Sequence, residues 1–583
     1  MKIRFNNILK ISVLLITIFL FPRESNSSET ISENNSENLI NKMQFITYFD
    51  DNSEFLQDDS MQNPFYEDKI GNIYLEKKEL YDTNTKYPIV NFVLKILNAI
   101  HINTKDYVVK NEILFYPGDT VDELLLEETE RNLRNLGIFS SVVVQLDSNN
   151  DVDIITQDSW SLKPSILLDI GGSEKSIGGR LNETNLFGTN TNISAEAVYR
   201  TRNDTKWGYG FSIQNNRIFK FGLGAKYAIY SDKYNFSQNI GLFKNFNHLN
   251  DKYAGGVFAD VNRGERYIYT HLTDFDKERT LRNFEEENYF AYFARAWKGI
   301  DRIFFSTSID INKTSREAHK IAYDNMGKFL LAFSSSSEEW VKLTRINSFI
   351  VEDVPIGGWG SAVIGRVFPM QNAEMPPMFY VAGSAERSYL SLDNKFYLFG
   401  QINASTSFSE AAPRFTYQEF QALSFYSFSP KFLIGGRLRQ QTIWNWGFYH
   451  RQLMLDNSTG LRGYKIDNLV GDNRLVTNIE FRWMPDIPFW IFNIGFNAFW
   501  DAGTVWRRGV GFFKTRWHHS AGIGIRFYNE SGDINSNAFR FDFAYNFDQM
   551  KFAEVIFSTN QFFSFFSSHA YVIPKVLGID IDY

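Results

Sequence analysis

The feature that most constrains the fold is a regular alternation of apolar and polar residues that runs from Leu162 to about Phe563. Successive side chains of a β-strand point to opposite faces, so a period of two predicts strands with one apolar and one polar face. In the clearest segment, aromatic residues alternate with Arg, Asp, Ala and Asn; the aromatic positions are Phe539, Phe541, Phe543, Tyr545 and Phe547. We therefore expect the chain to consist mainly of a long series of strands.

Alternation alone does not decide whether the apolar faces meet a second sheet, as in a soluble sandwich, or lipid. Aromatic residues make up 17% of the chain, and charged residues lie on the opposite faces, where a water-filled lumen would hydrate them. No run of about 18 apolar residues follows the amino terminus, which excludes helical membrane spans. Hydrocarbon does not tolerate open sheet edges, and closure removes them. These features predict a transmembrane antiparallel β-barrel over residues 161–563, with a carboxyl-terminal extension at 564–583.

The amino terminus has the pattern of an export signal. Lys2, Arg4 and Lys10 precede an apolar run from Ile11 to Phe21 that is short for a membrane anchor, so residues 1–27 are predicted to be a cleaved signal peptide. Residues 28–69 are rich in Ser, Asn, Asp and Glu and are expected to form a poorly ordered periplasmic leader. The chain has no cysteine, which excludes a lipid anchor on Cys, a CxxC redox motif and thiolate zinc sites.

Residues 70–160 carry a mixed pattern that predicts a small α+β domain. A first helix is expected over Thr104–Phe115, and a second begins with Thr120 and Glu123 as a capping box and stops at Gly137. The segment 81–102 is nearly all apolar from Ile89 to Ile100 and is expected to be an insertion that packs against the domain. The expected later strands cover Val142–Leu146 and Val152–Thr156.

A polar loop near the end of the barrel region contains Gly460-Leu461-Arg462-Gly463-Tyr464. An exposed arginine is usually only solvated. The two strands that follow change this interpretation, because strand parity puts Glu480 of the first and Asp501 of the second on the polar faces. A guanidinium inside a barrel needs planar carboxylate partners, and both acids have the correct parity to supply them.

Three motifs in this order, GLRGY at 460–464, NIEFRW at 478–483 and FWDAGTVW at 499–506, resemble the signature of the outer-membrane insertase superfamily, the BamA/TamA-like or bacterial surface antigen (D15) family. The segments YPGD (116–119), LRNLGIF (133–139) and DSWSLKP (158–164) resemble a POTRA domain. The resemblance implies a barrel of about 16 strands, in which a loop folds back into the lumen. It implies that Arg462 pairs with Asp501 and Glu480. The motif residues carried over are Leu461, Arg462, Gly463, Tyr464, Glu480, Asp501 and Gly503.

The resemblance also implies a closing strand that ends on an aromatic residue. Five strands are expected after the loop, the last of them near Glu554–Phe562. Before the loop the sequence offers more candidates than such a barrel needs, so those near Ile303–Ile311, Val341–Ile350 and Phe379–Ser388 are assigned to loop hairpins or to continuations of neighbouring strands. The residues assigned to the closing strand are Phe557, Phe562 and Phe563.

By this resemblance, the expected function is that of an assembly factor that inserts or translocates β-rich client proteins at the bacterial outer membrane, with the POTRA domain in the periplasm. The expected partners are the lipid bilayer, unfolded or extended clients that bind the POTRA domain, and periplasmic proteins or lipoproteins. A transporter of the two-partner secretion type and a passive outer-membrane channel remain alternatives.

Catalytic patterns are missing from the sequence. No HExxH, GxSxG or phosphate-binding loop occurs, and His518 and His519 are adjacent, so they would face opposite sides of a strand. The net charge of −7 is dispersed, which gives no sign of a nucleic-acid partner. The sequence therefore predicts neither enzymatic activity nor a cofactor or metal.

Overall fold

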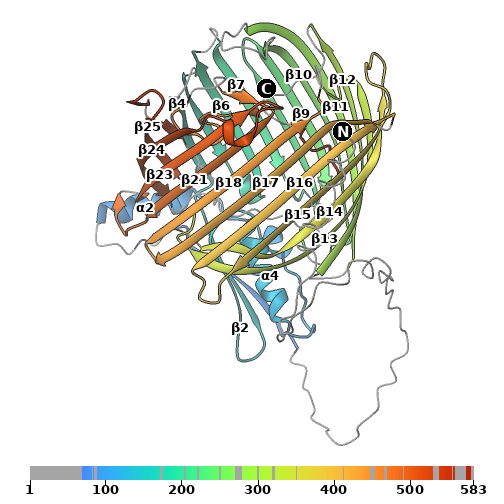
Figure 1. Ribbon diagram of the computed structural model, residues 1–583. Helices are drawn as coiled ribbons and strands as arrows, with labels where there is room; N and C mark the ends of the chain where they lie inside the picture. Colours follow the sequence, from blue (N-terminus) through green and yellow to red (C-terminus); the bar gives the residue numbers. More distant parts are fainter. Residues whose placement is uncertain are drawn as a thin grey trace, which may run out of the picture.

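The computed structural model describes residues 69–578 apart from gaps at 82, 84–87, 171–174, 202–204, 219–221, 249–250, 270–278, 298–300, 318–321, 350, 411, 447–452, 465–468, 490–491, 530–537, 554–555 and 559–572. The predicted signal peptide and leader, Phe562 and Phe563 lie outside these residues. The chain forms a small α+β domain at one end of a large closed barrel (Figure 1). No helix among the described residues is long and apolar enough to cross a membrane.

The small domain is a three-stranded sheet covered by helices. Its sheet has the order β1-β3-β2, with β1 (Ile73–Lys78) parallel and β2 (Phe139–Leu146) antiparallel to β3 (Val152–Asp158). Alternate residues of β3 are buried, and Val152 and Ile154 pack with Leu133 and Phe115 in the domain core. The helices are α2 (Pro88–Ile100), α3 (Asp106–Lys110) and α4 (Glu123–Asn135).

Two details of this domain differ from the expectation. The helix expected over Thr104–Phe115 is only the five residues of α3, Asp106–Lys110. It starts after Thr104, because Thr104 instead bonds the carboxylate of Asp158 through its amide and hydroxyl groups, at 2.7 and 2.9 Å. The cap of α4 is Asp122, whose Oδ1 accepts a 3.0 Å bond from the Leu124 amide, and not Thr120. The insertion contains α2, whose Asn98 donates to the Tyr81 carbonyl at 2.9 Å and so holds the helix to the end of β1.

The barrel is a single closed antiparallel sheet in which each strand pairs with its neighbours along the chain. The ring runs from β4 to β18, continues through β21, β23, β24 and β25, and returns through β27 to β4. Two-residue strands β22 and β26 pair with β23 and β25, and β19 and β20 form a separate hairpin inside the long β18–β21 connection. The closed ring leaves no sheet edge to be covered by lipid.

The strand bounds are β4 Leu162–Ile170, β5 Lys175–Glu183, β6 Thr191–Arg200, β7 Lys206–Asn215, β8 Leu223–Ser231, β9 Asn235–Lys244, β10 Tyr253–Tyr269, β11 Arg279–Trp297, β12 Asp301–Arg316, β13 Met326–Thr344, β14 Val351–Pro369, β15 Met378–Leu390, β16 Phe396–Ser409, β17 Ala412–Ser429, β18 Phe432–Trp444, β19 Leu453–Met454, β20 Val470–Gly471, β21 Asn473–Trp483, β22 Pro488–Phe489, β23 Phe492–Trp506, β24 His518–Asn529, β25 Ala538–Asn546, β26 Lys551–Phe552 and β27 Ile556–Ser558. Short 3₁₀ turns lie at Leu186–Gly188 and Phe512–Lys514.

The barrel has more strands than the predicted number of about 16. Leaving out the two-residue strands, the described residues form twenty strands around the ring, fifteen before the long loop and five after it. Two segments that were assigned to hairpins or continuations, near Ile303–Ile311 and Phe379–Ser388, are the complete wall strands β12 and β15. In the third, Val341–Ile350, residues 341–344 are the end of β13 and 345–349 form the bend after it, as the assignment to a continuation allowed.

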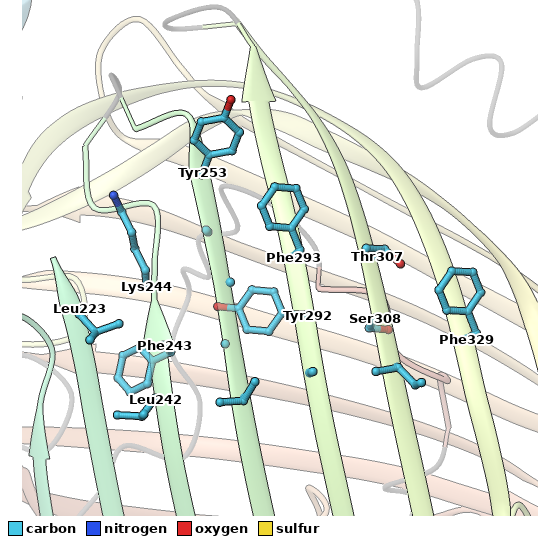
Figure 2. Close-up of a pocket in the computed structure, with 16 residues that line it drawn as sticks. Leu223, Leu242, Phe243, Lys244, Tyr253, Tyr292, Phe293, Thr307, Ser308 and Phe329 are labelled. Carbon is cyan, nitrogen blue, oxygen red and sulfur yellow. The ribbon is translucent and has the colours of Figure 1, made fainter. Parts of the chain in front are cut away.

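Strand parity separates an outer apolar surface from a polar lumen. On β21, the outward residues Ile479, Phe481 and Trp483 are exposed, while Glu480 and Arg482 on the other face are buried. Exposed apolar side chains of β8 to β13 line an outer groove of about 670 Å³ beside Gly255 and Gly256, from which Tyr253, Phe293 and Phe329 project (Figure 2). A barrel that presents such a surface matches the outward apolar band of a membrane β-barrel.

The small domain is fixed to the rim of the barrel at several separate points. Arg134 of α4 forms a bidentate pair with Asp353 at the start of β14, at 2.8 and 3.3 Å. Lys342 near the end of β13 bonds Glu130 of α4 at 2.7 Å. On the far side of the rim, Arg217 in the β7–β8 turn pairs with the buried Glu112. These charged contacts attach the domain to strands on different sides of the opening.

Candidate functional site: a buried arginine in the barrel lumen

The loop that carries the predicted arginine enters the lumen from the end of the barrel opposite the small domain. A tight turn forms its tip, in which Asp456 Oδ1 accepts bonds from the amides of Ser458 and Thr459, at 2.8 and 3.0 Å. Gly460 follows with a φ of 131°, a conformation that glycine adopts without strain. Leu461 is fully buried and packs with Leu455, Tyr464 and Val476, so the loop has a small apolar core of its own.

Arg462 is fully buried and lies against the inner wall. Its Nε and Nη2 atoms donate to the two oxygens of Asp501 on β23, at 2.7 and 2.8 Å. Its Nη1 atom donates to Glu480 Oε1 on β21 at 2.6 Å. The structure thus brings Arg462 together with both carboxylates that strand parity selected. The paired bonds to Asp501 have the planar geometry that favours arginine over lysine.

Further side chains complete this group. Asp542 of β25 lies 3.5 Å from Arg462 Nη1 and accepts a 2.6 Å bond from Arg526 of β24. Arg482 bonds the second oxygen of Glu480 at 3.0 Å. The amide of Asn478 donates to Asp501 Oδ1 and to the carbonyl of Gly460, both at 2.7 Å. Each carboxylate therefore has a partner in addition to Arg462, as buried charges require.

The ring of Phe499 lies directly against the guanidinium, with Arg462 Cζ 3.5 Å from the ring centroid. A cation held against an aromatic face in a water-poor site gains about 2 kcal/mol. Phe499 belongs to the inward face of β23, whose other inward positions include Asn497 and Asp501. The wall therefore contacts the guanidinium group in two ways: carboxylates bond its edge, and the Phe499 ring packs against its flat face.

The other motif residues set the spacing between loop and wall. Gly463 has a φ of 82°, and a Cβ atom there would lie 3.2 Å from the Cβ atoms of both Ala544 and Ala553. A Cβ atom on Gly503 would lie 2.9 Å from the Leu455 side chain. Tyr464 donates its hydroxyl toward the His519 carbonyl at 3.0 Å and Asp548 at 3.1 Å. Gly463 and Gly503 let the loop lie close to the inner wall, and the Tyr464 hydroxyl holds the loop to that wall.

Sequence reasoning missed several members of this site. Asp542 lay on the correct face of a correctly predicted strand, but a third acid was not sought, and Phe499 was not considered because aromatic residues were assigned to the lipid face. Arg482 and Arg526 could have been found by the same parity rule, since each is on an inward position beside an acid. The part of the chain that the structure describes holds no group of three or more His, Cys, Asp or Glu side chains suited to a metal ion.

The predicted closing strand is only partly described. β27 covers Ile556–Ser558 and is placed by pairs with β25, among them Phe557 with Phe541. β4 is its neighbour on the other side, which closes the ring. Phe562 and Phe563 remain untested positions because they lie outside the described residues.

Comparisons with known proteins agree with this architecture. Residues 100–157 match the POTRA family model, described as surface antigen variable number repeat. The chain is 25% identical over 157 residues to the outer membrane protein assembly factor BamA of Neorickettsia risticii (strain Illinois). That match spans 26% of this chain and only 21% of the relative.

Two solved structures align with most of this chain at low similarity. BamA from Haemophilus ducreyi lacking POTRA domains 1–3 has a TM-score of 0.31 at 12% identity, covering 84% of this chain and 83% of that one. CdiB from Acinetobacter baumannii has a TM-score of 0.44 at 13% identity, covering 84% and 73%. No function is taken from similarities at this level. The POTRA match, the BamA relative and the closed barrel together support placing this chain in the POTRA-containing, BamA/TamA-like family.

Proposed function

We propose that this chain is an outer-membrane assembly factor that receives extended, β-rich client proteins on its POTRA domain and passes them to the bilayer at the junction of β27 and β4. The observation that carries the proposal is the fixed position of a domain with exposed sheet edges at the rim of a closed barrel. We also propose that the protein works without enzymatic chemistry and acts by positioning its clients.

The receiving surface in this proposal is the β2 edge of the POTRA sheet. β2 pairs with β3 on one side only, and Val143 on it is exposed. An extended chain can add to such an edge through main-chain hydrogen bonds, which tolerate many sequences. The Val144 amide now donates to Glu130 Oε2 at 3.2 Å, which is the kind of bond that an added strand would replace.

The exit in this proposal is the junction at which the ring closes. Every other pair of neighbouring wall strands follows in order along the chain and is joined by a turn or loop, whereas β4 and β27 are the first and last strands of the ring and no such connection joins them. Ladder hydrogen bonds are therefore the main resistance to separating these two strands. This junction is the natural place for the wall to open toward lipid.

The driving free energy comes from the client and not from a nucleotide. A membrane strand of about ten residues presents about five side chains to lipid, and each buried apolar side chain gains roughly 1.5–3 kcal/mol. Insertion of a single strand thus releases on the order of 10 kcal/mol. The protein needs only to lower the kinetic barrier, by pairing the client strands before they meet hydrocarbon.

The test is a folding assay with a small eight-stranded barrel protein, diluted from urea into liposomes that contain the purified full-length chain. We expect faster folding than in liposomes without it. The substitution Val144→Pro removes the edge amide and should return the rate toward the unassisted value. Ile364→Thr, at an exposed outer position toward the end of β14 that is far from the POTRA domain, is the control and should leave the acceleration intact.

Two outcomes would reject the proposal. Equal folding rates with and without the protein would exclude an assembly role for this client class. Passage of the client into the liposome interior, with no membrane-inserted product, would instead favour the secretion-type transporter.

A further inference from the structure

We propose that the barrel lumen contains a binding site for a short apolar peptide, and that the chain's own residues 573–578 occupy it. The inference does not depend on the assembly role. It rests on contacts that these six residues make with strands on separate parts of the inner wall.

The first set joins the segment to β11 and β12. Ser308 Oγ, which is buried on the inward face of β12, donates a 2.7 Å bond to the carbonyl of Pro574. Ile573 packs against the aromatic cluster that contains Tyr292. The ammonium group of Lys575 lies 5.9 Å from the ring centroid of Phe290. One end of the segment is thus held by main-chain and aromatic contacts.

The second set joins the segment to β15 and β17. The hydroxyl of Tyr380, a fully buried residue of β15, accepts a 2.8 Å bond from the Leu577 amide and donates to the Lys575 carbonyl at 3.5 Å. Gly578 has a φ of 76°, and a Cβ atom there would come within 2.8 Å of the Tyr417 ring. The glycine therefore fits where a larger residue would be excluded.

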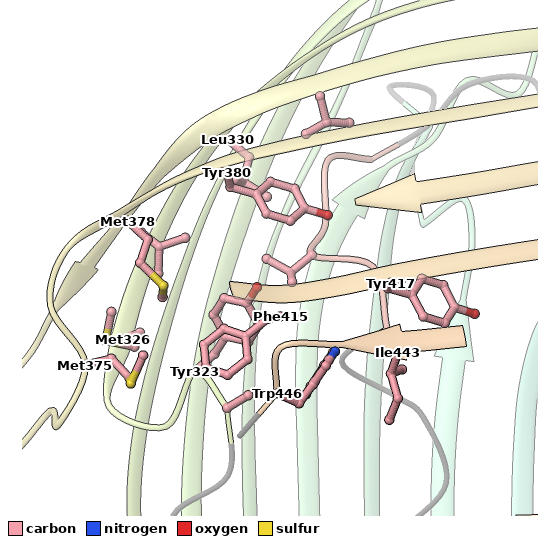
Figure 3. Packing of buried hydrophobic residues seen from close by; sticks show 14 of the residues in the cluster. Tyr323, Met326, Leu330, Met375, Met378, Tyr380, Phe415, Tyr417, Ile443 and Trp446 are labelled. Carbon is pink, nitrogen blue, oxygen red and sulfur yellow. The ribbon is translucent and has the colours of Figure 1, made fainter. Parts of the chain in front are cut away.

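Val576 enters the largest buried apolar cluster of the lumen, part of which Figure 3 shows. The cluster contains Tyr323, Phe415 and Trp446 from the turns at the end far from the POTRA domain, and also Leu453 at the start of the arginine-bearing loop. The segment and the loop therefore share one packed group. Together they occupy space through which a solute would have to pass.

These contacts define the peptide that the site selects. Two carbonyls and one amide of the bound backbone are recognised by hydroxyl groups, so these bonds depend on the main chain and require few particular side chains. Selectivity comes from the apolar pocket at Val576 and from the narrow space at Gly578. A short segment with an apolar residue two positions before a glycine that turns the chain meets both conditions.

The first test measures how often the segment leaves its site. The chain has no cysteine, so Val576→Cys introduces a single thiol at a position that is 6% exposed. A charged thiol reagent should label it slowly in this background. Adding Tyr380→Phe removes two hydrogen bonds to the segment and should raise the labelling rate roughly tenfold. Tyr323→Phe is the matched control, because its hydroxyl bonds Ser407 and not the segment.

The second test measures occupancy of the lumen. A chain that ends at residue 572 should conduct ions in planar bilayers more often than the full chain, and a synthetic peptide covering residues 573–583 should reverse the change, whereas a scrambled peptide should not. Rapid labelling of Val576→Cys without Tyr380→Phe, or equal labelling rates with Tyr380→Phe and Tyr323→Phe, would overturn the proposal. Those labelling measurements use the full-length chain and so decide the question even if the shortened chain does not fold.

Discussion

Substitution of Arg462 by alanine should be among the most destabilising single changes in the barrel. The substitution removes three charge-assisted hydrogen bonds and the stacked contact with Phe499. Glu480 and Asp542 keep Arg482 and Arg526 as partners, but Asp501 keeps only uncharged donors, the side-chain amide of Asn478 and the main-chain amide of residue 462. The free-energy cost is therefore concentrated on one buried, uncompensated carboxylate.

Removing one partner of a buried ion pair typically costs about 3–5 kcal/mol. The double substitution Arg462→Ala with Asp501→Asn removes the stranded charge as well. It should cost less than the sum of the two single changes by about 2–3 kcal/mol, because the two residues act on one interaction. If Arg462 acted only through the shape of the loop, Arg462→Ala would lower the free energy of unfolding by the same amount in the wild-type chain and in the Asp501→Asn variant.

The assay is urea unfolding of the purified protein in detergent micelles, followed by tryptophan fluorescence and by the gel mobility of the folded barrel, with refolding checked at each urea concentration. Arg180→Ala is the control, because Arg180 pairs with Glu196 in the same lumen but its side chain is 46% exposed. That change should cost no more than about 1 kcal/mol.

Two results would refute this reasoning. If Arg462→Ala and Arg180→Ala lower the free energy of unfolding equally, burial does not set the strength of the Arg462 contacts. If the double substitution is additive, Arg462 and Asp501 do not act as a pair.

Three further predictions concern the loop and the POTRA junction. Gly463→Ala should cost about 1–3 kcal/mol in the same unfolding assay, because it adds a strained φ to contacts of 3.2 Å; a neutral result would contradict the close packing. Burial raises the pKa of Glu112 to about 7, so in the His248→Asn variant the POTRA domain should become more stable as the pH falls from 7 to 4.5, which thermal unfolding of the domain can measure. His248 lies in the β9–β10 turn of the barrel, with its Nε2 atom 3.1 Å from Arg217 Nη1 at the junction with the POTRA domain. Burial and then Arg217 lower the pKa of His248 to about 4, so in the Glu112→Gln variant the junction should lose stability as the pH falls from 6.5 to 4 in the same thermal measurement; slopes of the same sign in both variants would disprove these assignments.

The sequence was most informative where the physical rule is local. Period-two alternation predicted the first four strands after the loop, at 474–483, 492–503, 520–528 and 539–547, to within three residues, because side-chain parity follows directly from the extended backbone. The family resemblance implied Glu480 and Asp501 as partners of Arg462, and parity agreed by placing both acids on the polar faces of their strands. Parity acts within a single strand, so it needs no knowledge of the rest of the fold.

Other features depend on the rest of the fold, about which the local sequence pattern carries no information. The number of strands was underestimated because alternation looks the same in a wall strand, such as β12, and in a hairpin outside the wall. The cap at Asp122 and the late start of α3 reflect competition for backbone amides, in which Asp158 binds Thr104 from more than fifty residues away. The position of residues 573–578 in the lumen depends on partners from strands far apart in the chain.

The contacts around Arg462 have a mechanical consequence for the whole ring. They connect β18, β21, β23, β24 and β25 through buried side chains, since Arg437 bonds Asn478 on one side and Arg526 bonds Asp542 on the other. On the opposite side of the β27 junction, β6 to β9 are only nine or ten residues long. Under the same load, a cross-connected arc is stiff and an arc of short strands is compliant. Elastic strain in the ring would therefore collect in β6 to β9, and any widening of the barrel would begin from that arc while the five connected strands stay in register.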